Sequence, residues 1–88
     1  MISKDYIILA PEGIHARPAT NLIRLTKKFK SVVSLKKSDH LIRLNSMLNI
    51  LAINAKGGET VTVIVEGEDE ADAAAAIDAF FAEELKNL

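Results

Sequence analysis

The segment 59–67, ETVTVIVEG, constrains the fold of this chain more than any other. Val61, Val63 and Val65 point to one side of an extended chain, and the residues between them point to the other. This period of two is typical of a strand that buries one face and leaves the other at the surface. We therefore expect a sheet that is covered on one face, with its other strands and its cover supplied by the rest of the chain.

The remaining segments supply three more strands and three helices. Strands are predicted at 2–9, 31–37 and 41–44, with SDH (38–40) as a hairpin turn, and helices at 16–29, 46–53 and 69–86. The glycines of NAKGG (54–58) are expected to end the middle helix. This order, βαββαβα, predicts an α+β fold with one domain over 1–88. It is an open-faced β-sandwich whose four-stranded, mostly antiparallel sheet carries three helices on one face.

The first and last helices are assigned from apolar residues that recur with helical spacing. In the first helix these residues are Ala19, Leu22, Ile23 and Thr26, and in the last helix they are Ala73, Ile77, Phe80 and Phe81. Asp69, Glu70 and Asp72 stand in the first turn of the last helix, where negative charge complements the helix dipole.

Composition excludes several classes of protein. The chain has 88 residues and no cysteine, so disulfides, thiolate metal sites and cysteine nucleophiles are excluded. No apolar run approaches the roughly 20 residues that span a bilayer, and the N-terminal segment lacks a signal-peptide cleavage site. We therefore expect a cytoplasmic monomer with no membrane insertion and no cofactor.

The charges are divided unequally along the chain. Residues 1–45 carry nine Lys or Arg against three Asp or Glu, and residues 46–88 carry two against nine, although the net charge is only −1. A basic surface is thus available in the first half. Nucleic-acid binding is not expected, because the chain has one Tyr, three Phe and no aromatic stacking motif. The basic surface fits an acidic protein partner better.

The segment GIHARPAT (13–20) carries the chemistry. Pro18 is typical of the first turn of a helix, so the helix is predicted to begin near Ala16 with His15 at its N-cap. Unpaired backbone N–H groups and the positive end of the dipole there favour anions, and Arg17 adds a guanidinium that binds phosphate oxygens. The same field disfavours a protonated imidazole and leaves the ring nucleophilic. A phosphorylated histidine satisfies both conditions.

The second histidine, His40, does not form a metal site with the first. It lies 25 positions further on, without ligand spacing, in the expected hairpin turn, and is interpreted as solvated surface. No metal site is predicted.

Over nearly its whole length the chain resembles HPr, the histidine phosphocarrier of the bacterial phosphoenolpyruvate-dependent sugar phosphotransferase system. GIHARPAT matches the active-site signature of that family, and the serine before the middle helix, the KGG turn and GEDE at 67–70 extend the resemblance. The resemblance implies that His15 takes a phosphoryl group on Nδ1 from phosphorylated enzyme I. His15 then passes it to sugar-specific EIIA domains, with Arg17 stabilising the charge. Such a carrier is a protein substrate and not an enzyme.

Ser46, at the start of the middle helix, has two interpretations. A serine before an apolar helical stretch is an ordinary N-cap. The resemblance implies instead phosphorylation by the ATP-dependent HPr kinase/phosphorylase, which would add negative charge beside Arg17, Arg24 and Lys27. Asn45 and Asn49 replace a basic residue and a glycine common in the family, which weakens this second interpretation.

Met47, Leu48 and Leu51 are too many apolar residues for one side of a short helix if Ile50 and Ile53 face the core. Either most of them are simply buried, or the three form an exposed apolar patch that basic side chains surround. We favour the patch, and expect partners to dock on it and on Arg24 and Lys27.

Two functions are consistent with these features. One is the phosphoryl carrier. The other is an HPr-like regulatory module that acts mainly as a serine-phosphorylated corepressor and binds a catabolite-control transcription factor. Regulatory members of the family lack the histidine, whereas this chain keeps His15, Arg17 and Pro18 together, which favours the carrier.

Overall fold

The computed structural model of this chain describes residues 1–8, 14 and 16–84. Its elements in chain order are β1 (Ile2–Ile7), α1 (Ala16–Thr26), β2 (Val32–Lys37), β3 (His40–Arg43), α2 (Met47–Ile53), β4 (Thr60–Glu66), α3 (Glu70–Ala79) and the π-helical segment η1 (Phe80–Glu84). Because η1 directly continues α3, the predicted order βαββαβα is confirmed.

The four strands form one sheet in the order β1-β4-β2-β3. All three pairings are antiparallel, so the expected mostly antiparallel sheet is antiparallel throughout its four strands. β4 is central, and its Val63 is in register with Lys4 of β1 and Leu35 of β2. The alternating valines therefore belong to one of the two interior strands, and Val61, Val63 and Val65 are all buried.

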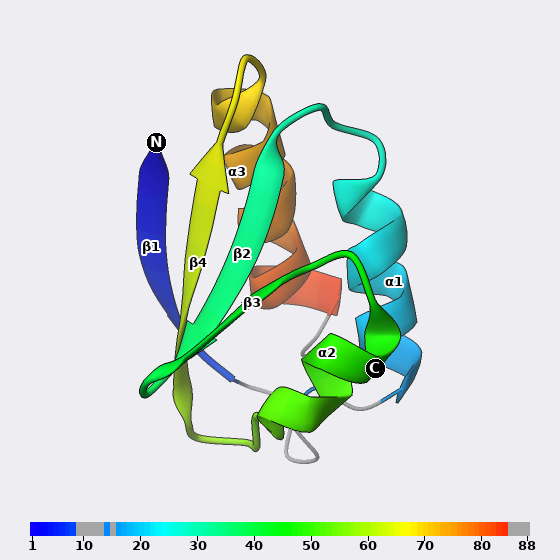
Figure 1. The fold of residues 1–88 in the computed structure, drawn as a ribbon, viewed down its shortest axis with the longest axis vertical. Helices are drawn as coiled ribbons and strands as arrows, with labels where there is room; N and C mark the ends of the chain where they lie inside the picture. The colour runs from blue at the N-terminus through cyan, green and yellow to red at the C-terminus, as the bar shows by residue number, and fades with distance from the viewer. Residues whose placement is uncertain (9–13, 15, 85–88) are drawn as a thin grey trace.

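The helices pack on the face of the sheet that these valines occupy, and Figure 1 shows α1 and α3 lying along that face with α2 at one end of it. Each helix contributes its apolar stripe to one core. The helix residues that enter the hydrophobic core are Ala19, Leu22 and Ile23 of α1, Ile50 and Ile53 of α2, and Ala73, Ile77, Phe80 and Phe81 of α3 and η1. The predicted open-faced β-sandwich with three helices on one face is confirmed.

Two connections differ from the sequence prediction. His40 is already the first residue of β3 and pairs with Lys37, so the hairpin turn consists of Ser38 and Asp39 only, with Ser38 at φ 54°. The residue that ends α2 is Asn54 and not a glycine: it is left-handed (φ 52°, ψ 49°) and donates its N–H to Leu51 O at 3.2 Å. Asn tolerates the left-handed conformation, so it can end the helix at the position where a glycine was expected.

The last helix also departs from the predicted single α-helix over 69–86. It changes to π-helical winding at Phe80 and keeps it to Glu84, while 85–86 lie outside the described residues. Both Phe80 and Phe81 are buried and meet edge to face, with ring centroids 5.4 Å apart. Phe81 also stacks on Tyr6 of β1 at 4.4 Å. The wider winding turns the chain less per residue, which suits two consecutive rings that both enter the core.

Candidate functional site

His15, the predicted phosphoryl acceptor, lies outside the described residues, so its placement at an N-cap stays a prediction. The structure does describe what adjoins it in the chain. α1 begins at Ala16, and Pro18 is fully buried in its first turn, as expected for a proline that starts a helix. On the other side, Ile14 is buried and donates its N–H to Ala55 O at 2.9 Å. Two described residues that flank His15 in the sequence, Ile14 and Pro18, are therefore packed in the protein interior.

The three predicted basic site residues are exposed on or next to α1. Arg17 is in its first turn, Arg24 in its last turn, and Lys27 directly follows its end. Within residues 1–8, 14 and 16–84 these three side chains form no ion pair. Since α1 buries its other side through Leu22 and Ile23, the helix presents its positive charge to solvent and potential partners.

α2 sorts its apolar residues between the core and the surface. Ile50 and Ile53 are buried, whereas Leu48 is 79% exposed and Leu51 is 39% exposed. Met47 is half-buried against the core, and Thr20 Oγ1 of α1 donates to its Sδ at 3.2 Å. Of the three residues predicted to form an exposed apolar patch, the structure thus places two at the surface and the third between α1 and the core.

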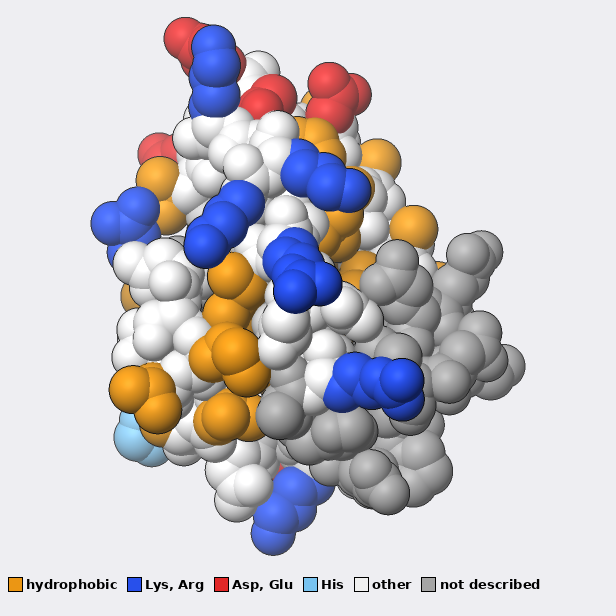
Figure 2. Space-filling model, turned by 90° about the vertical axis from the view of Figure 1, so that its right-hand side faces the viewer, with side chains coloured by type: hydrophobic (Ala, Val, Ile, Leu, Met, Phe, Trp, Pro, Cys, Tyr) orange, Lys and Arg blue, Asp and Glu red, His pale blue; other side chains and the backbone are white. Residues whose placement is uncertain are grey.

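Figure 2 shows the resulting face of the molecule, with Lys and Arg side chains spread across it above a cluster of hydrophobic side chains. A hollow of about 280 Å³ lies between α1 and the start of α2. Its lining residues are Thr20, Ile23, Arg24, Lys27, Asn45 and Met47. The structure therefore brings the predicted basic residues Arg24 and Lys27 together with Met47 around one depression.

Ser46 occupies the N-cap position of α2 with an extended backbone (φ −149°, ψ 133°). Its carbonyl accepts the N–H of Ile50 at 3.3 Å, but its side chain makes no capping hydrogen bond to α2, a helix that is described throughout. The residue is half-buried. The ordinary capping role expected for this serine is therefore not performed by its hydroxyl.

Several acidic residues of the second half hold the fold together. The Asp69 carboxylate accepts the N–H of Lys30 at 2.8 Å and the N–H and hydroxyl of Ser31 at 2.9 and 2.5 Å, which fixes the connection from α1 to β2. These hydrogen bonds, the Ser31 hydroxyl first, lower the pKa of Asp69 below its ordinary value. The Glu70 carboxylate forms an ion pair with the amino group of Met1, with N and Oε2 2.7 Å apart.

A further acid, Glu59, is paired in the same way. Its carboxylate lies 3.0 Å from Lys37 Nζ, and the hydrogen bond from Lys37 lowers the pKa of Glu59. Lys37 also donates to Asn54 O at 2.9 Å, so this lysine ties β2 to the end of α2. The positive charge of Lys37 is thus neutralised, unlike that of Arg24 and Lys27.

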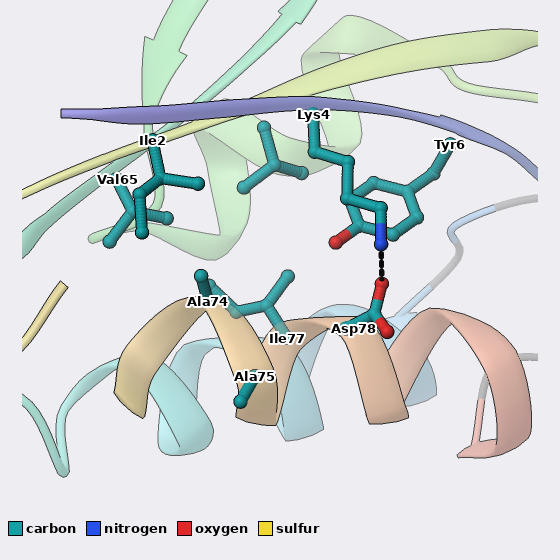
Figure 3. A pocket seen from close by; sticks show the side chains of 9 residues that line it. Ile2, Lys4, Tyr6, Val65, Ala74, Ala75, Ile77 and Asp78 are labelled. Atoms are coloured by element: carbon teal, nitrogen blue, oxygen red, sulfur yellow. Dashed lines mark hydrogen bonds and ion pairs between the residues drawn. The ribbon is translucent and has the colours of Figure 1, made fainter. Parts of the chain in front are cut away.

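A second depression, of about 210 Å³, lies between β1 and α3 (Figure 3). Lys4 Nζ and Asp78 Oδ1 bridge it at 2.5 Å. Burial and the hydrogen bond to Asp78 raise the pKa of Tyr6 to about 12, so its hydroxyl stays protonated. The charged groups here neutralise one another across the cleft, which therefore lacks the free positive charge found on the side of α1 and α2.

Sequence reasoning missed the contacts of Asp69, Lys37 and Asp78, since each joins residues far apart in the chain and has no local pattern.

Among the described residues, no group of three or more His, Asp or Glu side chains is placed to hold a metal ion. Within the same part of the chain, no helix has the length and hydrophobicity needed to cross a membrane.

Comparison with known proteins defines the class. Residues 2–83 match the family model of the PTS HPr component phosphorylation site, and the chain therefore belongs to the HPr family of the phosphotransferase system. Proteins of this family are phosphocarriers and not catalysts, and their partners are components of the same system, such as enzyme I and EIIA.

Three solved structures show how close the similarity is. The histidine-containing phosphocarrier protein of Mycoplasma is 28% identical, with a TM-score of 0.90 over 96% of both chains. HPr-C-His of Thermoanaerobacter tengcongensis is 29% identical, with a TM-score of 0.84 over 94% of this chain and 98% of that one. The catabolite repression protein Crh of Bacillus subtilis, described as a domain-swapped dimer, is 28% identical, with a TM-score of 0.76 over 96% and 97%.

Proposed function

We propose that this protein relays a phosphoryl group through His15, from phosphorylated enzyme I to sugar-specific EIIA domains. The single observation that carries the proposal is the start of α1 at Ala16, directly after His15, in a chain that matches the phosphorylation-site family model. Arg17 is exposed in the first turn of that helix, one residue away from the helix start. The neighbouring residues thus have the chemistry that a phosphohistidine requires.

The transfer is a displacement at phosphorus. A neutral imidazole nitrogen of His15 attacks the phosphoryl group of enzyme I, the new N–P bond forms, and the bond from phosphorus to enzyme I breaks. The reverse roles apply when an EIIA side chain attacks phosphorylated His15. In both steps Arg17 offsets the charge on the phosphoryl oxygens, and a positive surface attracts partners whose own surfaces are acidic.

The test is phosphorylation by enzyme I and phosphoenolpyruvate, followed by intact-mass measurement. We expect one phosphoryl group that is lost in acid and retained in base, and no phosphoryl group on His15→Ala. His40→Ala is the matched control, because His40 is exposed on β3 and its loss should leave phosphorylation unchanged. Labelling that survives His15→Ala would refute the proposal.

Arg17 is tested by the transfer rate. Arg17→Ala should slow phosphorylation by enzyme I while leaving the circular dichroism spectrum and the urea midpoint unchanged, since the side chain is exposed. Lys28→Ala is the control, because Lys28 is also exposed but was not assigned to the site. Equal rates for the wild type and Arg17→Ala would show that the guanidinium has no part in transfer.

We further propose that Ser46 is phosphorylated by HPr kinase/phosphorylase and that the product binds a catabolite-control transcription factor. Two observations support this second function: the Ser46 hydroxyl makes no capping bond to α2, and the chain is as similar in sequence to Crh as to the Mycoplasma phosphocarrier. A dianionic group here would stand beside the hollow that Arg24 and Lys27 line.

The regulatory proposal is tested with ATP and a kinase/phosphorylase from the same cell. An acid-stable phosphate should form on the wild type and on Ser38→Ala, and should be absent from Ser46→Ala. Ser38 is a suitable control because it is an exposed serine in the β2–β3 turn. Failure of the wild type to gain an acid-stable phosphate would remove the regulatory role and leave the relay through His15 untouched.

A further inference from the structure

The chain between α2 and β4, residues 54–59, holds residues that precede the predicted phosphoryl acceptor. We call it the 54–59 connection. The N–H of Ile14 donates to Ala55 O at 2.9 Å, and the N–H of Ile8 donates to Glu59 O at 2.8 Å. Both isoleucines are buried. The backbone of the connection is therefore bound to the residue directly before the acceptor and to the chain that follows β1.

Lys37, at the end of β2, links the two ends of the 54–59 connection. Its Nζ donates to Asn54 O at 2.9 Å and to Ile53 O at 3.4 Å, and it pairs with Glu59 Oε1 at 3.0 Å. The two carbonyl groups lie at the C-terminal end of α2, where the helix dipole favours a cation. One ammonium group thus contacts Asn54 at the start of the connection and Glu59 at its end.

The burial of Lys37 distinguishes it from an ordinary surface ion pair. Along β2 it lies two residues after the buried Leu35, so its side chain points to the face of the sheet that carries the helices and is only 20% exposed. Figure 1 shows the turn between β2 and β3 at the same end of the sheet as the 54–59 connection. Exposed pairs contribute little because water competes for their charges. Lys37 instead binds backbone carbonyl groups, so it restrains the path of the chain.

We propose that Lys37 is a positioning residue for phosphoryl transfer at His15. Lys37 fixes the 54–59 connection, and the connection fixes Ile14, the residue directly before His15. The proposal rests on the proposed relay, because it takes His15 to be the acceptor. Transfer requires the attacking nitrogen to be held close to its reactive position, so a small displacement of the supporting backbone lowers the rate.

The effect falls on the transfer step rather than on docking. Lys37 binds carbonyl groups at the end of α2, whereas Met47 and Leu48 lie at its start. Loss of the ammonium group should therefore lower the maximal rate of transfer while the concentration that gives half of this rate stays the same.

Hydrogen exchange at the Ile14 amide tests the positioning without enzyme I. Lys37→Met removes the ammonium group and keeps an unbranched side chain. Relative to the Leu44 amide, which donates to Val33 O at 2.9 Å, the Ile14 amide should exchange about fivefold faster in Lys37→Met than in the wild type. Lys36→Met is the matched control, because it removes the same charge from an exposed neighbour in β2 and should leave the Ile14 amide unchanged.

Single-turnover mixing with phosphorylated enzyme I tests the consequence for transfer. We expect Lys37→Met to lower the maximal rate about three- to tenfold and to change the half-saturating concentration less than twofold. Lys37→Arg should restore most of the rate, since a guanidinium can donate to the same carbonyl groups. Val33→Ala is the stability control. Val33 is buried near the other end of β2, so this variant should lower the urea midpoint and leave the maximal rate unchanged.

The outcomes separate the positioning role from the relay. Equal exchange of the Ile14 amide in Lys37→Met and Lys36→Met, or a maximal rate that Lys37→Met leaves unchanged, would overturn the positioning role and leave the relay in place. A loss of rate that Val33→Ala reproduces would also overturn it, because general stability would then account for the effect. A wild type that takes no phosphoryl group from enzyme I would overturn the relay, and the positioning role with it.

Discussion

Replacing Leu48 by alanine separates the surface role of α2 from its structural role. Full burial of a leucine side chain stabilises a fold by about 1.5–3 kcal/mol. Leu48 is 79% exposed, so only about a fifth of that stabilisation is at risk, and Leu48→Ala should lower the free energy of unfolding by at most about 0.6 kcal/mol. Alanine is also a good helix former, which offsets part of this loss.

Ile50, two residues further along the same helix, is the matched contrast. It is 0% exposed, so Ile50→Ala should cost about 2–5 kcal/mol through lost burial and the cavity left behind. Urea denaturation followed by circular dichroism measures both values. A loss for Leu48→Ala as large as that for Ile50→Ala would refute the assignment of Leu48 to the surface.

Leu48→Ala should weaken partner binding more than it weakens the fold. If a partner covers the exposed four-fifths of Leu48, Leu48→Ala removes about 1–2 kcal/mol of binding free energy and raises KM for phosphorylation by enzyme I about 5- to 30-fold. The measurement is the initial rate of phosphorylation as a function of the concentration of this protein. The assay temperature is kept below the thermal unfolding midpoint of each variant. An unchanged KM with unchanged stability would show that no partner buries Leu48.

Three other perturbations have defined outcomes. A Cβ at Gly67 (φ 154°) would lie 2.7 Å from Ser31 Cα, whereas one at Gly58 (φ 87°) would meet nothing within 4 Å, so by urea denaturation Gly67→Ala should cost about 2–4 kcal/mol and Gly58→Ala about 1 kcal/mol. Equal losses would contradict the close approach to Ser31. Because the folded-state pKa of Asp69 is lowered, its stabilising effect is complete above the ordinary pKa of Asp and is lost as the pH falls through the folded value. Asp69→Asn should therefore lower the urea midpoint at neutral pH, and the difference from the wild type should shrink in acid; a difference that stays constant with pH would refute the pKa assignment. Ser46→Asp should slow transfer from enzyme I by adding negative charge near Arg24 and Lys27, without lowering the urea midpoint, and an unaltered rate would count against electrostatic regulation.

The sequence predicted those parts of the fold that depend on local periodicity. The alternation through Val61, Val63 and Val65 identified a half-buried strand, and the helical spacing of Leu22 and Ile23 identified the buried side of α1. Strand order did not follow from these patterns, because periodicity shows which face is buried but not which strand lies beside it. The start of α1 at Ala16 did follow, because proline has few places in a helix.

Features that depend on distant contacts or on alternative residues were missed. Asn54 took the left-handed position that was expected of a glycine, since both residues tolerate it. The π-helical winding at Phe80 depends on packing against β1, 70 and more residues earlier in the chain, which no local pattern records. The Asp69 carboxylate was interpreted only as a complement to the helix dipole, although its hydrogen bonds go to another connection.

The contacts of the acidic residues give a structural reason for the unequal division of charge along the sequence. Asp69, Glu70 and Asp78 are each bound to a donor elsewhere in the fold, so the acidic second half contributes contacts that hold the sheet, α3 and the α1–β2 connection together. Arg24 and Lys27 have no such partner in the described chain and remain at the surface. Because their substitution removes no ion pair within the described chain, the basic surface can vary with the partner while the core stays constant. A protein that docks on several different partners through one surface requires this separation, and it predicts that charge changes at Arg24 alter association rates without altering stability.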